Sequence, residues 1–344
     1  MKKIDILNAN KVFVIAEAGV NHNGDMTLAK KLIYAAKEAG ADAVKFQNFK
    51  ASRVISTFAK KAEYQKNHTN DSESQLDLVS KLELKDDDYK TLQDYAKKLG
   101  ILFMSTPKDI PSAELLEKIN MPIYKIGSSE INNFEFLHYI SKTNKPIILS
   151  TGMCILSEVE AAINIIKNSS NSPISILHCV SQYPSPIDQV NLNSMLTMKK
   201  VFGLPVGYSD HTIGSEVVLA AVALGAEIIE KHFTIDKSLQ GPDHKVSMDL
   251  PEMKSMILSI RKVESCLGDG IKKPADCEIN NLMLLRRSLV FAKNFKKGHI
   301  LEDFDMTIKR PGNGLEPKFK NKIIGNVLSE DVVMDEPINW NHFL

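Results

Sequence analysis

The sequence predicts a (β/α)8 TIM barrel followed by a small β-rich domain. Short runs of β-branched residues alternate with amphipathic stretches from residue 11 to about residue 267. Eight such runs are present, and eight strand–helix units in roughly 250 residues match the strand count and size of a TIM barrel. Beyond residue 267 this periodic pattern stops, and polar sequence rich in turn residues begins.

The expected barrel strands are short apolar runs, most of them rich in Val and Ile. They cover residues 12–18, 43–47, 101–106, 123–128, 146–152, 174–180, 205–210 and 228–234. Apolar residues spaced three and four apart predict helices over 28–40, 89–100, 157–168 and 215–225. The helices 28–40, 89–100 and 215–225 each end at a glycine, which suits a helix C-cap. A doubly wound sheet is the alternative, but it usually has fewer strands and opens on a G-x-G-x-x-G loop, a spacing that GVNHNG lacks.

Three parts of the chain are expected: a barrel over residues 1–267, a linker over 268–284 and a C-terminal domain over 285–344. The last part has only about 60 residues, which suits a small domain that is stabilised by packing against a larger one. Inside the barrel, the connection over residues 48–85 is far longer than the two to six residues usual for such loops. Because it leaves the C-terminal end of a strand, it is either a substrate lid or surface decoration.

The composition excludes several classes of protein. Lys and Arg number 43 against 42 Asp and Glu, and the net charge of +1 gives no basic surface for nucleic acid. The N-terminal stretch has no long apolar run and no window of 18 residues is uninterruptedly apolar, so neither secretion nor a membrane span is expected. The four cysteines lack C-x-x-C spacing and are interpreted as reduced thiols of a cytoplasmic protein.

Polar side chains stand at the ends of all eight expected strands. In a TIM barrel these ends form one face, which holds the catalytic groups. The side chains expected there are Glu17, Lys45, Gln47, Thr106, Lys125, Ser128, Glu130, Ser150, Thr151, His178, Tyr183, Asp210, His211, Glu230, Lys231, His232 and Asp243. One buried lysine has an ordinary structural explanation, but polar groups at eight strand ends favour a functional site.

These side chains sort into three chemical groups. The first is cationic and rich in hydroxyls, which suits a phosphate ligand, and consists of Lys45, Thr106, Lys125, Ser128, Ser150 and Thr151. The second is the pair His211 and His232 on neighbouring strands, which suits a divalent transition metal. Glu17 and Glu130 remain as candidate bases or as partners of the other groups.

Several of these residues also have a plainer explanation. His178 lies in an apolar strand, where a structural role is favoured. Lys125 alone would suit a Schiff-base aldolase, although the nearby hydroxyls and the second lysine favour phosphate. Asp210 is interpreted as the cap of the helix that begins near Ser215, or as a hydrogen-bond partner that steadies the imidazole of His211.

Eight motifs together resemble the sialic acid synthase family. They are IAEAGVNHNGD, AVKFQ, KIGSSE, STGM, HCVSQYPSP, VGYSDHT, EKHFT with GPDH, and KRPGNG, and they extend over nearly the whole chain. Members of this family condense phosphoenolpyruvate (PEP) with an N-acetylated mannose-type sugar to make a nonulosonic acid. The resemblance implies a TIM barrel followed by an antifreeze-like (SAF) domain, and a homodimer in which that domain reaches the partner's active site.

The resemblance also implies a role for each candidate residue. It assigns PEP binding to Lys45, Thr106, Lys125, Ser128 and Ser150, with Thr151 near, and sugar binding to Gln47, Tyr183, Asp243 and the partner subunit's Arg310. It makes His211 and His232 ligands of a divalent metal, Mn²⁺ first and Mg²⁺ or Co²⁺ as alternatives, which polarises the sugar aldehyde. Glu17 and Glu130 would handle the attacking water and the developing charges.

Two departures from the family pattern bear on which sugar is used. Many sialic acid synthases have Asn-x-Tyr after the sixth strand, where this chain has Ser181, Gln182 and Tyr183, and the connection after the second strand is longer here. Both features resemble the branch that makes N,N'-diacetyllegionaminic acid. A 2,4-diacetamido-2,4,6-trideoxymannose substrate is therefore favoured, with N-acetylmannosamine, the precursor of N-acetylneuraminate, as the next choice.

Two other functions remain as alternatives to the metal-dependent condensation. One is a Schiff-base pyruvate aldolase that uses Lys125, and the other is a non-catalytic protein that binds ice or a partner through its antifreeze-like end. The polar groups at every strand end favour the condensation.

Overall fold

The computed structural model describes residues 11–62 and 73–344. The chain divides into two compact units, Met1–Gly268 and Asp269–Leu344. Each unit has its own apolar core. The two units are therefore described separately.

The first unit is a barrel of eight parallel strands. They are β1 (Phe13–Gly19), β2 (Ala43–Asn48), β3 (Leu102–Pro107), β4 (Tyr124–Ile126), β5 (Ile147–Ser150), β6 (Ile174–Cys179), β7 (Val206–Asp210) and β8 (Ile228–His232). The sheet order is β3-β2-β1-β8-β7-β6-β5-β4, and β3 also contacts β4, so the sheet closes. The predicted TIM barrel is confirmed, with strand bounds close to those expected.

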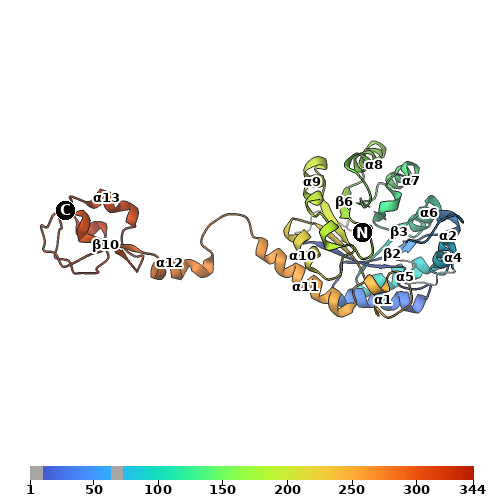
Figure 1. Cartoon of the computed structure of the whole chain (residues 1–344), viewed down its shortest axis with the longest axis horizontal. Helices are drawn as coiled ribbons and strands as arrows, with labels where there is room; N and C mark the ends of the chain where they lie inside the picture. Colours follow the sequence, from blue (N-terminus) through green and yellow to red (C-terminus); the bar gives the residue numbers. More distant parts are fainter. Residues whose placement is uncertain (1–10, 63–72) are drawn as a thin grey trace. The chain divides into compact units, whose positions relative to one another are not determined.

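Helices surround the barrel strands (Figure 1). They are α1 (Met26–Ala39), α2 (Ala51–Val54), α4 (Gln75–Ser80), α5 (Asp86–Leu99), α6 (Ile110–Lys118), α7 (Phe134–Ser141), α8 (Leu156–Ser169), α9 (Asn193–Phe202), α10 (Glu216–Ala223) and α11 (Leu250–Leu267). Short 3-10 turns, η1 (Ser128–Glu130), η2 (Ile187–Gln189) and η3 (His244–Val246), follow β4, β6 and β8. The four helices expected from the apolar spacing are all present within three residues of their expected bounds.

Local sequence explains where these helices begin and end. Asp25 caps α1, because its side chain accepts hydrogen bonds from the backbone N–H groups of Thr27 and Leu28. Gly40 ends the helix in the left-handed conformation, with φ 88°, as the sequence predicted. The apolar face of α1 then packs into the core between the helices and the strands.

Strand periodicity decides which side chains face the barrel interior. Successive residues of a strand point to opposite faces, so Glu230 and His232 of β8 share one face and Lys231 takes the other. A small apolar layer that includes Ile15, Met104 and Leu177 fills the interior. Polar inward-facing residues lie beyond this layer, at the C-terminal ends of the strands.

The second unit is small and rich in turns. Its antiparallel strands β9 (Ser288–Phe291) and β10 (Met306–Lys309) pair with each other, and isolated bridges such as Phe295 with Val332 hold the remaining extended segments. Helices α12 (Ile279–Leu285) and α13 (Lys320–Ile323) complete it, with the 3-10 turns η4 (Asp276–Glu278), η5 (Asp303–Asp305), η6 (Pro317–Phe319) and η7 (Trp340–His342). A β-rich domain was expected here.

The segment expected to be a linker contains a helix. Residues 279–285 form α12, and the carbonyl of Met283 accepts a hydrogen bond from the backbone N–H of Gly312. This bond joins α12 to the second unit. The turn-rich composition of residues 268–281 concealed it, because α12 has only seven residues and no long apolar pattern.

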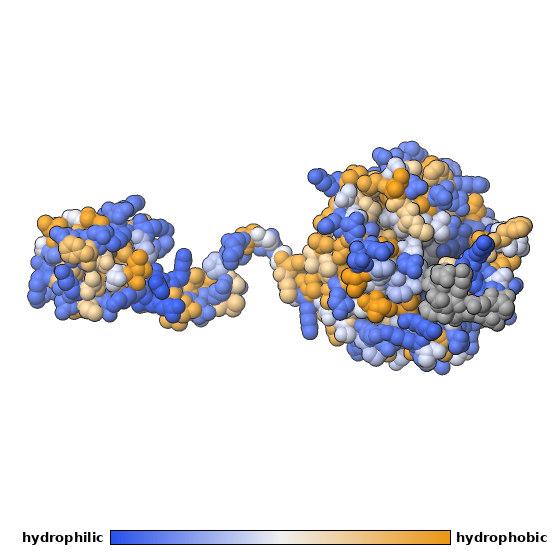
Figure 2. All heavy atoms as spheres, viewed as in Figure 1, coloured by the Kyte–Doolittle hydropathy of each residue, from blue (hydrophilic) through white to orange (hydrophobic). Residues whose placement is uncertain are grey.

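Hydrophilic and hydrophobic residues are interspersed over the visible face of each unit (Figure 2). Across residues 11–62 and 73–344, no helix has both the length and the hydropathy that a membrane span requires. The four cysteines are all free thiols, as the sequence analysis expected.

Candidate active site

A cavity of about 460 Å³ opens at the C-terminal ends of the barrel strands. We call it the lysine cavity, because Lys45 of β2 and Lys125 of β4 lie at its base and are both nearly fully buried. The predicted residues that line it are Glu17, Lys45, Gln47, Thr106, Lys125, Ser128, Ser150, Tyr183, His211 and His232. The structure therefore brings together side chains from across the whole barrel.

One carboxylate connects the two lysines. The Oε1 atom of Glu230 lies 3.7 Å from Nζ of Lys45 and 3.5 Å from Nζ of Lys125. Each lysine also has a second anchor: Lys45 pairs with Glu17 at 2.8 Å, and Lys125 donates a hydrogen bond of 2.7 Å to the hydroxyl of Ser150. Both ammonium groups are thus fixed at one place in a cavity that a small ligand can enter.

The hydroxyl and amide groups around the lysines are also oriented. Lys45 donates to Oγ1 of Thr106 at 3.0 Å, and Gln47 donates through Nε2 to Oε1 of Glu17 at 3.0 Å. The hydroxyl of Ser128 accepts a hydrogen bond from the backbone N–H of Gly152 at 2.9 Å. These contacts hold two of the predicted hydroxyls against the lysine cavity.

Burial and charge shift the pKa values of this cluster in different directions. Burial favours the neutral amine of both lysines, but Glu17 and Glu230 outweigh it at Lys45 and raise its pKa. At Lys125 burial prevails over the attraction of Glu230, and its pKa is lowered. Burial alone would raise the pKa of Glu230, but Lys125 and Lys45 lower it, so that this carboxylate is ionised.

Two neighbouring histidines line the lysine cavity. The ring centroids of His211 and His232 are 5.4 Å apart, and Tyr183 packs against His211 with its centroid at 4.1 Å. Nδ1 of His211 lies 2.7 Å from the carbonyl oxygen of Val180, which can only accept, so Nδ1 bears a proton and Nε2 is the nitrogen left for a ligand. Burial alone would lower the pKa of His211, but Cys179 and the carbonyl of Val180 raise it.

His232 has a different environment. Its Nδ1 atom has no hydrogen-bond partner in the described part of the chain and lies 3.6 Å from Oδ2 of Asp243. Burial, the neighbouring His211 and Lys45 lower its pKa well below the ordinary value. His232 is therefore neutral at physiological pH and available as a ligand or a hydrogen-bond partner.

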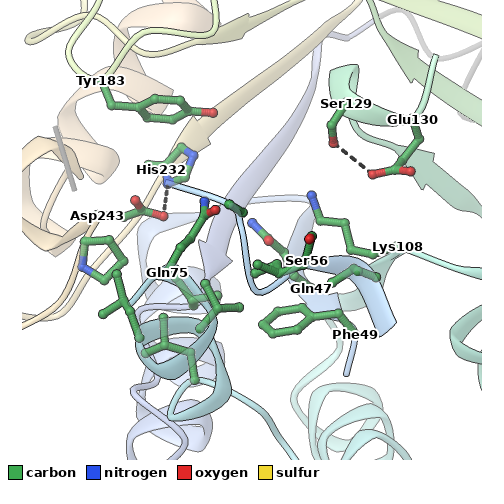
Figure 3. Close-up of a pocket in the computed structure, with 18 residues that line it drawn as sticks. Gln47, Phe49, Ser56, Gln75, Lys108, Ser129, Glu130, Tyr183, His232 and Asp243 are labelled. Atoms are coloured by element: carbon green, nitrogen blue, oxygen red, sulfur yellow. Dashed lines mark hydrogen bonds and ion pairs between the residues drawn. The ribbon is translucent and has the colours of Figure 1, made fainter. Parts of the chain in front are cut away.

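A second cavity, of about 420 Å³, adjoins the first. We call it the adjoining cavity. Both cavities are lined by Gln47, Gln75, Lys108, Ser129, Tyr183 and His232. In Figure 3, Tyr183, His232 and Asp243 lie on one side of the adjoining cavity, and Ser129 and Glu130 lie on the other, joined by a hydrogen bond of 2.9 Å.

The long connection after β2 forms part of the adjoining cavity. Ser56 lies between α2 and α4, Gln75 begins α4, and both line the cavity. The stretches SQLDLVSKLEL and KKAEYQK of this connection both have helix-like sequences. The first contains α4, and most of the second lies outside the described residues. Surface decoration is therefore an incomplete description of this connection, because it supplies a cavity wall.

Lys108 is the most informative residue that the sequence analysis did not select. Lys108 follows β3 and lines both cavities, and burial, together with nearby Lys45, lowers its pKa. In the sequence STPKD, Lys108 comes just after the end of an expected strand, and this position was the signal that could have identified it as a site residue. Glu230 was recognised at a strand end, but only the fold shows that it bridges two lysines.

Three predicted groups lie elsewhere. The hydroxyl of Thr151 donates to the carbonyl of Leu177 at 2.9 Å, and its side chain faces a different cavity, of about 250 Å³. Arg310 belongs to the C-terminal unit, so its predicted contact with the sugar stays a prediction. Nε2 of His178 lies 2.7 Å from the carbonyl of Val190, which agrees with its expected structural role.

Neither interpretation of Asp210 is correct. Its carboxylate accepts hydrogen bonds from the N–H and the hydroxyl of Thr212, at 3.0 and 3.1 Å, and pairs with Lys231 at 2.5 Å. Ser215 is the N-cap residue of α10, and His211 is held by Val180 instead. Asp210 and Lys231 point away from the barrel interior, because successive residues of a strand point to opposite faces. The motif VGYSDHT alone does not show which face Asp210 occupies.

The comparisons with known proteins agree with this geometry. The model of the NeuB family matches residues 32–272, and that of the SAF domain matches residues 286–344. The chain belongs to the NeuB family. The SAF match identifies the predicted antifreeze-like domain.

Among relatives of this NeuB-family chain is the N,N'-diacetyllegionaminic acid synthase of Campylobacter jejuni, with 49% identity over 95% of this chain and 99% of the relative. The enzyme of the same name from Legionella pneumophila is 47% identical over 96% of this chain and 94% of the relative. A crystal structure of N-acetylneuraminic acid synthetase from Leptospira borgpetersenii, in complex with citrate, matches with a TM-score of 0.72 and 36% identity. That match covers 80% of this chain and 91% of the other.

Proposed function

We propose that this NeuB-family chain is a nonulosonic acid synthase that condenses PEP with 2,4-diacetamido-2,4,6-trideoxymannose to give N,N'-diacetyllegionaminate. One observation supports this most strongly. Two buried lysines bridged by Glu230 open onto two histidines, in a chain close to half identical to two diacetyllegionaminic acid synthases. N-acetylmannosamine is the next choice of sugar.

In this proposal the lysine cavity binds PEP. Lys45 and Lys125 meet the negative charges of its phosphate and carboxylate, and Thr106, Ser128 and Ser150 donate further hydrogen bonds. Glu230 holds both ammonium groups in position before the ligand arrives. Thr151 lies near this group but faces a different cavity, so it is left out of the PEP contacts.

In this proposal PEP reacts with the open-chain aldehyde of the sugar. Carbon 3 of PEP attacks the aldehyde carbon, water adds at carbon 2, and the resulting tetrahedral intermediate breaks its C–O bond to release phosphate. The products are one nonulosonic acid and one phosphate, which balances one PEP, one sugar and one water. Glu17, ion-paired with Lys45, and Glu130 are the carboxylates we assign to the water and to the developing charges.

His211 and His232 are the residues we assign to a divalent metal. Their donor atoms suit it, because Nε2 of His211 takes no part in the hydrogen bond to Val180 and Nδ1 of His232 is buried without a hydrogen-bond partner among the described residues. The described residues contain no group of three or more His, Cys, Asp or Glu arranged as a complete metal site, so substrate and water would supply the other ligands. When bound, Mn²⁺, or alternatively Mg²⁺ or Co²⁺, polarises the sugar aldehyde as a Lewis acid.

The sugar lies in the adjoining cavity in this proposal. Gln47, Tyr183 and Asp243 line that cavity and are assigned to its polar groups. Burial, together with Glu17, raises the pKa of Asp243 to about 6, so this group is mainly an accepting carboxylate at pH 7 and gains a donor as the pH falls toward 6. Arg310 from the exchanged C-terminal domain of a homodimer remains the proposed partner of the N-acyl group, and the reaction is assigned to the cytoplasm.

A Schiff-base pyruvate aldolase is the second candidate. The lowered pKa of Lys125 favours it, because a neutral buried amine is a nucleophile. The hydrogen bond from Lys125 to Ser150 and its pairing with Glu230 favour instead an ammonium group that binds an anion.

A phosphate-release assay tests the proposal. The purified chain is incubated with PEP and with each sugar of a small N-acyl mannose panel, with and without EDTA. We expect sugar-dependent phosphate release that EDTA abolishes and Mn²⁺ restores. Activity that persists in EDTA would contradict the metal role, and borohydride trapping of pyruvate on Lys125 without phosphate release would support the aldolase.

A further inference from the structure

One wall of the adjoining cavity is apolar, although its other walls are polar. We call it the apolar wall, and it consists of Phe49, Val54, Ile55, Leu78, Val79 and Leu82. Phe49, Leu78 and Leu82 are at most 7% exposed. Figure 3 shows Phe49 across the cavity from Glu130 and Ser129. An apolar surface of this kind is an unusual lining for a sugar that carries a hydroxyl on every carbon.

The wall is fixed to the barrel by hydrogen bonds and ion pairs. Helices α2 and α4 pack against each other. The backbone N–H of Ala51 donates to Oε1 of Glu83 at 2.6 Å, and Arg53 donates to Asp109, just before α6, at 2.5 Å. These contacts hold both ends of α2, so the described part of the long connection presents a preformed surface to the cavity.

The position of the wall determines which end of the sugar it meets. In the proposed function PEP occupies the lysine cavity and the sugar the adjoining cavity, so the carbon–carbon bond would form where the two cavities meet, beside His232. The aldehyde carbon therefore lies at this junction. The remaining carbons of the sugar extend into the adjoining cavity, toward α2 and α4.

We propose that the apolar wall, and Leu78 and Val79 of α4 in particular, determines which sugar this enzyme accepts. This inference rests on the proposed function. The favoured sugar has a methyl group at carbon 6 and an acetamido methyl at carbon 4, which are apolar and lie at the end remote from the aldehyde. N-acetylmannosamine carries hydroxyls at both positions, and against the wall those hydroxyls lose water without gaining a hydrogen bond.

Substitutions on α4 test this assignment. Val79→Thr replaces a methyl by a hydroxyl with almost no change in volume. Leu78→Asn replaces the two branch methyls of a more buried wall residue by a carboxamide. Leu76→Asn is the matched control, because Leu76 is on the same helix but does not line either cavity. For each variant, kcat/KM is measured with saturating PEP for the diacetamido sugar and for N-acetylmannosamine, together with the KM for PEP.

We expect Leu78→Asn and Val79→Thr to lower kcat/KM for the diacetamido sugar about 10-fold to 100-fold, mainly through KM. The value for N-acetylmannosamine and the KM for PEP should stay unchanged, and Leu76→Asn should behave as wild type. The preference of the enzyme for the diacetamido sugar therefore falls in the two wall variants alone.

The inference and the proposed function fail in different ways. If wild type is active and both wall variants keep the wild-type preference and PEP affinity, the apolar wall does not determine specificity. A wild-type preference for N-acetylmannosamine would also overturn it while leaving the condensation intact. If wild type releases no phosphate from PEP with any sugar, the proposed function itself fails.

Discussion

Strands β7 and β8 carry buried charges on both of their faces, and the two faces differ. On the outer face Lys231 pairs with Asp210, and Asp210 accepts two further hydrogen bonds from Thr212. On the inner face Glu230 is shared by two lysines, and its Oε2 atom has no hydrogen-bond partner among the described residues. The outer group has its hydrogen bonds complete, although Lys231 and Thr212 also line a small cavity of about 200 Å³, whereas the inner group has an oxygen without a partner in the described part of the chain, beside the lysine cavity.

The difference teaches how to separate a structural ion pair from a binding site. A buried charge is tolerated when its hydrogen bonds are complete, as they are at Asp210. A buried charge that is left with spare bonding capacity beside a cavity is available to a ligand. Changes to the inner face should therefore affect activity, and changes to the outer face should affect stability.

The largest expected effect is on the inner face. His211→Ala and His232→Ala should each lower turnover at least about 1000-fold, because each removes a proposed ligand of the metal that polarises the aldehyde. PEP affinity, measured by titration calorimetry, and the melting temperature should stay close to wild type. His178→Gln is the control, since His178 contacts Val190 and not the lysine cavity. Wild-type turnover in either alanine variant would contradict the assignment of activity to the inner face.

Lys231→Met tests the outer face. It leaves the carboxylate of Asp210 buried without its cation, and we expect it to lower the free energy of unfolding by about 3–5 kcal/mol. The kcat of the folded enzyme should remain near wild type at a temperature where the variant is still folded. Denaturant unfolding and steady-state kinetics measure the two quantities, and a large loss of kcat without a loss of stability would assign Lys231 to the active site.

Lys125→Met is the same substitution on the inner face. We expect about a 100-fold loss of kcat/KM for PEP, because one cation of the anion site is removed. The stability should change less than in Lys231→Met, since Lys45 remains beside Glu230. Equal losses of stability in the two methionine variants would contradict the distinction between the two faces.

The smallest effect concerns Asp305 in the C-terminal unit, another buried carboxylate with partners. Burial alone would raise its pKa, but the hydrogen bond from His299, at 2.8 Å, and the N–H of Glu302 lower it. A lowered pKa means that the ionised form stabilises the fold above the ordinary value of 3.8, and that this stabilisation is lost as the pH falls through the folded value.

Asp305→Asn should therefore cost about 1 kcal/mol near pH 7 and much less near pH 3. The fluorescence of Trp340, the single tryptophan of the chain, reports on the unfolding of this unit in the full-length protein. A difference between wild type and variant that stays constant with pH would show that the carboxylate charge plays no part.

Much of this arrangement could be predicted from the sequence. Strand periodicity and the count of strand–helix units gave the barrel, and the convergence of strand ends brought Lys45, Lys125, His211 and His232 to one cavity. The direction of each side chain was harder to predict. Asp210 and His211 are adjacent in sequence but face opposite sides of β7, and the sequence analysis interpreted Asp210 either as a helix cap or as a partner of the His211 imidazole.

Other features depend on contacts between distant segments. The bridge from Glu230 to two lysines requires β2, β4 and β8 to converge in space, and no local pattern encodes the distances involved. The apolar wall likewise depends on how α2 and α4 fold back over the strand ends, so the composition of residues 48–85 did not reveal it.

The most direct test of the central claim is the fate of the bridging oxygen of PEP. Wild-type enzyme, the diacetamido sugar and PEP with isotopically heavy oxygen between carbon 2 and phosphorus are incubated, and both products are analysed by mass spectrometry. The account predicts that the heavy oxygen leaves with phosphate and that nonulosonic acid forms in equal amount. Heavy oxygen retained in the organic product, or phosphate released without sugar, would contradict it.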